Sequence, residues 1–249
     1  MHRYLHEWAS PAIFYRRAGR LIPWLWLLAA CLLGAGLVGG LILAPTHYEQ
    51  GEVYRIIYVH VPSAWMGMFV YSFMAGAAAI GFVWRVKLAE VVARESAPLG
   101  AAFTALALAS GSLWGARTWG AWWVWDARLT SVLILFFLYI GFMALQLAIE
   151  DRRKAARAGA ILALVGIVNI PIIHYSVVWW NTLHQGATVS KASAPSMTAD
   201  MLTPLLLMAA GFMAYFAAAV LSRSRCEILE RERNRHWVKE VIGESLSDG

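Results

Sequence analysis

The feature that most constrains this chain is a series of six apolar runs, each about as long as a helix needs to cross a bilayer. Hydrophobic residues make up 60% of the 249 residues and charged residues only 14%, more apolar surface than a soluble domain can bury. The sequence therefore predicts an all-α polytopic membrane protein with six transmembrane helices. The runs cover residues 22–43, 62–84, 98–114, 129–149, 159–179 and 199–221.

The basic residues are distributed unevenly between the runs. Four precede the first run, three lie between the second and third, four lie between the fourth and fifth, and six follow the last. Because Lys and Arg gather on the cytoplasmic side of membrane proteins, both termini are predicted to be cytoplasmic and the alternate connections external. The net charge of +6 is therefore explained by contact with the lipid bilayer, and no nucleic-acid partner is predicted. The external connections hold the other four basic residues, Arg55, Arg117, Arg128 and Lys191.

The chain divides into three predicted parts. Residues 1–20 mix aromatic, aliphatic and basic side chains, which is typical of a cytoplasmic segment lying on the membrane surface, although a disordered basic tail is an equal alternative. Residues 21–222 form the membrane domain, and residues 223–249 form a cytoplasmic tail. The first run has no small-residue cleavage site at its end, so we expect it to stay in the membrane. Charged side chains are nearly absent inside the runs, which disfavours a coupled ion pathway.

Residues 114–128 hold five tryptophans closed by an aspartate and an arginine, W-G-A-R-T-W-G-A-W-W-V-W-D-A-R. An aromatic belt is the simplest explanation, because Trp and Tyr gather at both membrane faces. A belt has no need of a carboxylate, however, and on an interfacial helix Trp119, Trp122, Trp123 and Asp126 would share one face. Flat indoles suit a large planar apolar surface, so the segment is predicted to cover a planar ligand or a partner.

Two histidines are predicted to flank this segment at the same membrane depth. His60 comes just before Pro62, which suits the first turn of a helix, and His184 lies a few residues beyond the fifth run. Taken singly, each is explained by a polar residue at the interface. Taken as a pair beside the tryptophans, they favour the two axial ligands of a haem iron.

Other metal arrangements have weaker support. Zinc needs three or four ligands in a tetrahedral array, and the external connections offer no thiolate and no close cluster of His and Asp. His47 lies farther from a helix end. His174, within the fifth run, is interpreted as a buried structural hydrogen bonder, with a supporting role beside the site as the alternative. The cysteines, Cys31 and Cys226, belong to no C-x-x-C-H motif, so covalent haem attachment is not expected.

The external arginines are candidates for binding carboxylates. Haem propionates are carboxylates, and a guanidinium can bind a carboxylate through two parallel hydrogen bonds. Arg55 and Arg128 are the predicted propionate ligands, with Asp126 or a phospholipid phosphate as their alternative partners.

The segment W-G-A-W-W-V-W-D-A-R resembles the signature of the WWD superfamily of cytochrome c maturation proteins. The motifs R-I-I-Y-V-H-V-P and P-I-I-H-Y-S-V-V-W-W-N-T-L-H-Q-G and the D-R-R-K loop are similar to those of the CcmC family in particular, over nearly the whole chain. The resemblance implies that haem b is held non-covalently between His60 and His184 at the outer face of the bacterial inner membrane. It also implies that the haem is covered and presented by Trp114, Trp119, Trp122, Trp123, Trp125 and Asp126.

The resemblance implies the partners as well. CcmC-like proteins pass haem to the chaperone CcmE, and they assemble with the ATPase CcmA, the permease CcmB and the small subunit CcmD in an ABC-type complex. Such a subunit would act by positioning its ligand rather than as a classical enzyme, so Asp126 is not predicted to be a general base. The alternatives are a transporter that carries haem or another solute across the bilayer, and an electron-transferring b-type cytochrome.

Overall fold

The computed structural model describes residues 10–180, 182–184, 186, 189 and 196–247. Six helical segments in it are long and apolar enough to cross a membrane, which confirms the predicted all-α fold with six spans. The described chain is helical almost throughout, and a further helix, α9 (His236–Ser247), follows the last span. The spans are α2 (Pro11–Val38) with the π-turn η1 (Gly39–Leu43), the 3-10 turn η2 (Glu52–Ile56) with α3 (Ile57–Trp84), α4 (Lys87–Thr118), α5 (Ala127–Ala148), α6 (Arg152–Gly166) with α7 (Asn169–Trp179), and α8 (Ala199–Arg231).

Several helices extend beyond the predicted runs. The second span starts at Glu52 rather than residue 62, the third starts at Lys87 rather than residue 98, and the last continues to Arg231 rather than residue 221. The added turns carry charged residues, because the ends of a membrane helix lie among lipid headgroups and water. Apolar run length therefore measures the part of each helix inside the hydrocarbon and misses its polar ends.

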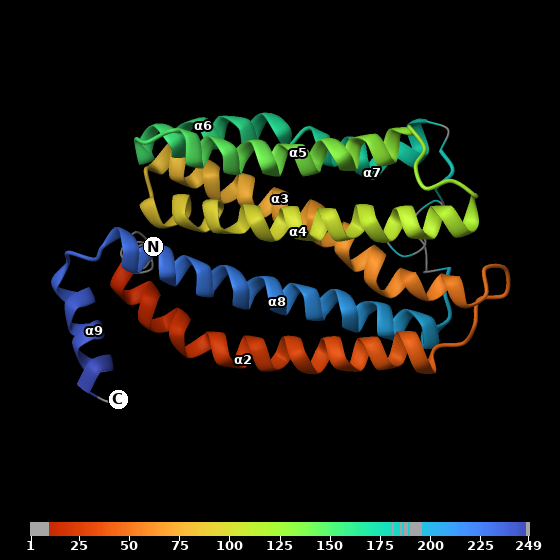
Figure 1. Ribbon diagram of the computed structural model, residues 1–249, viewed down its shortest axis with the longest axis horizontal. Helices are drawn as coiled ribbons and strands as arrows, with labels where there is room; N and C mark the ends of the chain where they lie inside the picture. Colours follow the sequence, from red (N-terminus) through yellow and green to blue (C-terminus); the bar gives the residue numbers. More distant parts are fainter. Residues whose placement is uncertain (1–9, 181, 185, 187–188, 190–195, 248–249) are drawn as a thin grey trace.

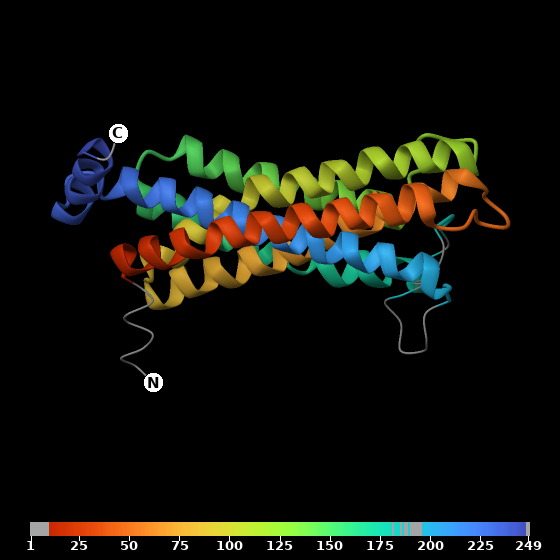
Figure 2. The ribbon, with the colours of Figure 1, turned by 90° about the horizontal axis from the view of Figure 1, so that it is seen from below.

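The spans form an elongated bundle in which α2 packs on α8 and α3 packs on α4 (Figure 1). The start of α2 and all of α9 lie at one end of the bundle, and the connection between α4 and α5 lies at the other end in both views (Figure 2). This connection contains the tryptophan-rich segment. The predicted orientation, with the tryptophan end on the periplasmic side of the membrane, stays a prediction.

Close contacts between small and aromatic residues hold the core together. A Cβ on Gly100 would lie 2.1 Å from the ring of Tyr139, whose hydroxyl donates a hydrogen bond of 2.8 Å to the carbonyl of Gly67. Glycines at such positions let membrane helices approach closely. A second cluster, which includes Tyr58, Leu205 and Met208, fixes the first turns of α3 at the tryptophan end.

The fifth span is broken, although a continuous helix over residues 159–179 was expected. The break at residues 167–168 separates α6 from α7, and Pro171 lies four residues after its start. Proline has no N–H to donate to the carbonyl four residues earlier, so the ladder of α-helical hydrogen bonds is interrupted there. The side chain of Asn169 bridges to α5 by donating a 2.8 Å hydrogen bond to the Ser131 carbonyl.

Candidate ligand site at the tryptophan-rich end

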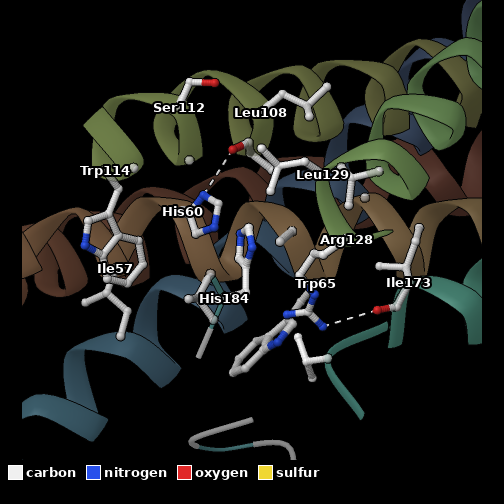
Figure 3. Close-up of a pocket in the computed structure, with 18 of the residues that line it drawn as sticks. Ile57, His60, Trp65, Leu108, Ser112, Trp114, Arg128, Leu129, Ile173 and His184 are labelled. Atoms are coloured by element: carbon white, nitrogen blue, oxygen red, sulfur yellow. Dashed lines mark hydrogen bonds between the residues drawn. The ribbon is translucent and has the colours of Figure 1, made fainter. Parts of the chain in front are cut away.

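A cavity of about 270 Å³ lies at the tryptophan end of the bundle. Its walls come from α3, α4, α5 and α7 and from residues between α7 and α8 (Figure 3). The structure thus brings together residues that are far apart in the sequence. Six of the predicted site residues line it: His60, Trp114, Trp119, Trp123, Arg128 and His184.

His60 projects into this cavity from the first turn of α3. Its Nδ1 atom lies 3.0 Å from the carbonyl oxygen of Ala107 and 3.1 Å from the hydroxyl of Ser110, both on α4. Because a carbonyl oxygen can only accept, Nδ1 carries the proton and Nε2 keeps its lone pair. Gly111 makes room for the ring, since a Cβ there would lie 2.8 Å from Cε1 of His60.

His184 is held by Asp126. Its Nδ1 lies 3.3 Å from Oδ2 of Asp126, to which the Thr182 hydroxyl also donates. The other oxygen of Asp126 accepts a 2.8 Å hydrogen bond from the backbone N–H of Leu129 and thereby caps the N-terminus of α5. One carboxylate therefore fixes both the start of a helix and the orientation of a histidine.

The electrostatics of this pair set the charge of both groups. Burial alone would raise the pKa of Asp126, but the hydrogen bonds from Thr182 and Leu129 outweigh it and hold the pKa below its usual value. Burial lowers the pKa of His184, even though the Asp126 carboxylate acts in the opposite direction. At neutral pH, His184 is therefore a neutral imidazole that donates from Nδ1 and keeps its lone pair on Nε2. Its ring meets Trp119 edge-on at 4.9 Å.

The tryptophan-rich segment does not form the interfacial helix that was considered. Helix α4 ends at Thr118, Trp119 follows as its C-cap, and Gly120 has φ = +73°. A left-handed glycine directly after the cap is the common way to end a helix, so the W-G dipeptide was the signal that the helical-face argument missed. Asp126 then caps the next helix, and residues 119–126 form an irregular connection.

This connection turns the tryptophans in different directions. Trp119 and Trp123 line the cavity, whereas Trp122 and Trp125 are 65% and 75% exposed and do not line it. Trp123 has a buried Nε1 without a hydrogen-bond partner in the described part of the chain. An unsatisfied buried donor is costly, so its place in the cavity wall fits a ligand that supplies an acceptor. Trp114 differs, because its Nε1 donates a 2.8 Å hydrogen bond to Oε1 of Gln50.

The two predicted arginines have different surroundings. Arg128, in the first turn of α5, lines the cavity and donates a 3.2 Å hydrogen bond to the Ile173 carbonyl (Figure 3). It donates a second hydrogen bond of 3.2 Å to the Ser176 hydroxyl. Arg55 pairs with Glu52 and donates a 2.9 Å hydrogen bond to the Gly40 carbonyl, so it ties η2 to η1 and does not line the cavity. In the described part of the chain, no ion pair joins Arg128 to Asp126.

The structure also places residues that the sequence argument missed or interpreted differently. His174 is exposed and lines the cavity, so the favoured interpretation as a buried hydrogen bonder was wrong, and its alternative, a supporting role beside the site, stays a prediction. Trp65, two turns into α3, and Gln50, before η2, line the cavity as well. Neither belongs to a recognisable motif, and only the packing of helices brings them to the site. His47 does not line the cavity itself, but its ring stacks at 4.1 Å on Tyr54, which does.

The donor set limits which metal could bind here. In the described ranges, no three His, Cys, Asp or Glu side chains gather closely enough to hold a metal ion. His60 and His184 supply only two nitrogen donors. A metal bound between them would therefore take its other ligands from an organic molecule that binds together with the metal. A tetrapyrrole supplies four in-plane nitrogens and leaves two axial positions for histidine.

Comparison with known proteins supports a close family relationship. The model of the family described as "Heme exporter protein C" matches residues 4–239. Relatives named heme exporter protein C include one from Haemophilus influenzae, 48% identical over 96% of this chain and 97% of its own length. The relative from Escherichia coli strain K12 is 49% identical over 97% of this chain and 98% of its own, and that from Bradyrhizobium diazoefficiens is 49% identical over 91% and 86%.

Proposed function

Because this chain belongs to the heme exporter protein C family, we propose that it binds haem non-covalently, as haem b, between His60 and His184 and presents it to another protein. The observation that carries the proposal is the shared orientation of the two histidines. Each projects into the same cavity, and each has its Nδ1 engaged by an acceptor, the Ala107 carbonyl or the Asp126 carboxylate. Both Nε2 lone pairs are thereby available to a metal, as in metal sites whose histidines are oriented by a second hydrogen bond.

The rest of the cavity suits a large, flat and mostly apolar ligand with acidic groups. Trp114, Trp119 and Trp123 provide indole surfaces for a macrocycle, and Arg128 provides a guanidinium for a propionate. Arg128 is already oriented by Ser176 and Ile173, so little side-chain entropy would be lost on binding. Arg55 already pairs with Glu52 and donates to the Gly40 carbonyl, so it is assigned a structural role between η2 and η1.

The size and surroundings of the cavity support presentation rather than storage. Its volume of about 270 Å³ is near the lower end of the range for small-molecule pockets, ~300–1,000 Å³, so a haem would extend beyond it. Trp122 and Trp125 lie exposed next to Trp123, which lines the cavity. A partner that docked on them would reach the uncovered edge of the macrocycle. This protein's own contribution is to hold and orient the haem, and no acid–base step is assigned to it.

The family relationship supports the setting of this activity. We assign the chain to the bacterial inner membrane with the tryptophan end in the periplasm, the haem chaperone CcmE as acceptor, and CcmA, CcmB and CcmD as subunits of the same complex. The four basic residues predicted on the external side, against the many at the other end, support this orientation. Passage of haem through this chain is the weaker alternative, because the paired ligands lie at one end of the bundle.

The test is haem content and coordination in the full chain purified in detergent. Wild type should carry haem with a six-coordinate, low-spin absorption spectrum. His60→Gly and His184→Gly should each lose that spectrum, and added imidazole should restore it, because free imidazole can enter the space that the side chain leaves. His236→Gly, which alters a histidine on α9 at the other end of the bundle, is the matched control and should behave as wild type. Unchanged six-coordinate haem in both site variants would refute the ligand assignment.

A further inference from the structure

A second cavity, of about 850 Å³, lies at the opposite end of the bundle and has no part in the proposed haem site. It is formed where α3 and α8 end and where α4 and α6 begin (Figure 1). Its lining is strongly basic, with seven Lys and Arg side chains against two carboxylates, Glu90 and Glu232. Like charges around one space repel one another, so the cavity attracts anions.

Most of this charge is not neutralised within the protein. Two of the lining arginines, Arg152 and Arg231, form ion pairs with Glu227, at 3.8 and 2.6 Å. In the part of the chain that the structure describes, the other five have no carboxylate within ion-pair distance. They are Arg85, Lys87, Arg153, Arg157 and Arg235.

The backbone at the cavity also favours an anion. Arg85 has φ = 56° and ψ = 35°, and it is the one non-glycine residue with positive φ among those described. Gly or Asn adopts this conformation at lower cost than arginine does, so a smaller residue would suit the backbone here better. Helix α4 starts beside it without a side-chain cap at Val86, and its first turn, which includes Glu90, lines the cavity.

The surface next to the cavity is suited to a lipid. The last turn of α3 exposes three apolar side chains beside the basic residues, Phe82, Val83 and Trp84, which are 40%, 61% and 69% exposed. A soluble anion has no use for such a surface, whereas the acyl chains of a phospholipid do. Basic pockets between membrane helices near the headgroup region are suited to anionic lipid headgroups.

We propose that this cavity binds the phosphate groups of an anionic phospholipid, whose acyl chains lie along the end of α3. The excess of basic side chains over carboxylates favours a headgroup with two phosphates, as in cardiolipin, over a headgroup with one. Arg85, Arg153 and Arg157 are assigned to the headgroup, since they line the cavity and form no ion pair in the described part of the chain. The proposal is independent of the haem site at the other end of the bundle.

Native mass spectrometry of the full chain in detergent tests this assignment, with cardiolipin, phosphatidylglycerol or phosphatidylcholine added at equal concentration. Wild type should retain cardiolipin best and phosphatidylcholine least. In the double variant Arg153→Gln/Arg157→Gln, cardiolipin binding should be weaker by a factor of at least about ten. The control Lys154→Gln/Arg233→Gln removes the same charge from side chains outside the cavity and should behave as wild type.

A second variant separates lipid binding from folding. Arg85→Asn removes one charge but suits the left-handed backbone, so it should weaken cardiolipin retention without lowering the melting temperature. Equal retention of all three lipids, or unchanged retention in the double variant, would overturn the proposal. Displacement of the lipid by inorganic pyrophosphate at the same concentration would reassign the cavity to a soluble anion. Loss of a partner subunit in the double variant with lipid retention unchanged would reassign it to a protein contact.

Discussion

Asp126 lies between a helix and a histidine: one carboxylate oxygen caps α5 through Leu129, and the other lies 3.3 Å from Nδ1 of His184. The W-D-A-R sequence therefore couples the start of a membrane helix to the orientation of a proposed haem ligand. This relationship explains why a carboxylate occurs among the tryptophans, where a simple aromatic belt would have no use for it.

Replacing Asp126 by Asn should separate its two roles. Asn is as good an N-cap as Asp, so the melting temperature should change little. Without the carboxylate, the proton of the neutral His184 ring should no longer be held on Nδ1. Haem affinity should then fall by about ten- to a hundredfold, as for other residues that orient metal ligands. Asp151→Asn is the matched control, because Asp151 caps α6 in the same way but at the other end of the bundle. Equal haem affinity in both variants would contradict the orienting role.

The stability of the haem-free protein should depend on pH through His184. Burial holds the folded-state pKa of His184 below the ordinary value of 6.5, so the unfolded chain takes up a proton before the folded chain does. His184 therefore favours the folded state most above pH 6.5, and this contribution is lost as the pH falls below that value toward the lowered folded-state pKa. Melting temperatures of wild type and His184→Gln from pH 8 to pH 5 should diverge least at the acidic end. A difference that is independent of pH would show that His184 is not buried as a neutral ring.

A single methyl group should disable His60 without unfolding the helix. A Cβ on Gly111 would lie 2.8 Å from the imidazole, so Gly111→Ala should displace the ring and abolish the six-coordinate spectrum. Alanine is favoured over glycine inside a helix by about 1 kcal/mol, so the substitution should not destabilise the α4 helix. Gly76→Ala is the matched control, since a Cβ on this helical glycine would meet nothing within 4 Å. A normal haem spectrum in Gly111→Ala would place His60 elsewhere in the haem-bound protein.

The outward and inward tryptophans should have different effects. Trp122→Ala and Trp125→Ala remove exposed indoles, so the protein should keep its haem and transfer less of it to CcmE. Trp119→Ala and Trp123→Ala remove cavity walls and should lower haem retention itself. Haem retained on the purified chain and haem transferred to CcmE are measured on the same membranes. The account would be wrong if the outward pair lost haem while the inward pair kept it.

More of the fold than of the candidate site could be predicted from the sequence. Six apolar runs were enough for six spans, because crossing a bilayer demands length and hydrophobicity. The break before Asn169 and the irregular connection after Trp119 were missed, because they depend on single Pro and Gly residues rather than on average hydropathy. His60 and His184 line one cavity in the structure, and their role as ligands stays a prediction. The different surroundings of Arg55 and Arg128 could not be predicted, because both are simply external arginines in the sequence. Only the tertiary packing places Arg55 against Glu52 and Arg128 in the cavity wall.

The central claim is that two imidazoles bind one haem iron through their Nε2 atoms. Near-infrared magnetic circular dichroism of the ferric, haem-loaded chain tests this claim most directly, because the energy of its charge-transfer band depends on the pair of axial ligands. The account predicts the band of bis-imidazole ligation in wild type, its loss in His60→Gly and in His184→Gly, and its return with added imidazole. A wild-type band typical of any other ligand pair, or the same bis-imidazole band in either variant without imidazole, would contradict it.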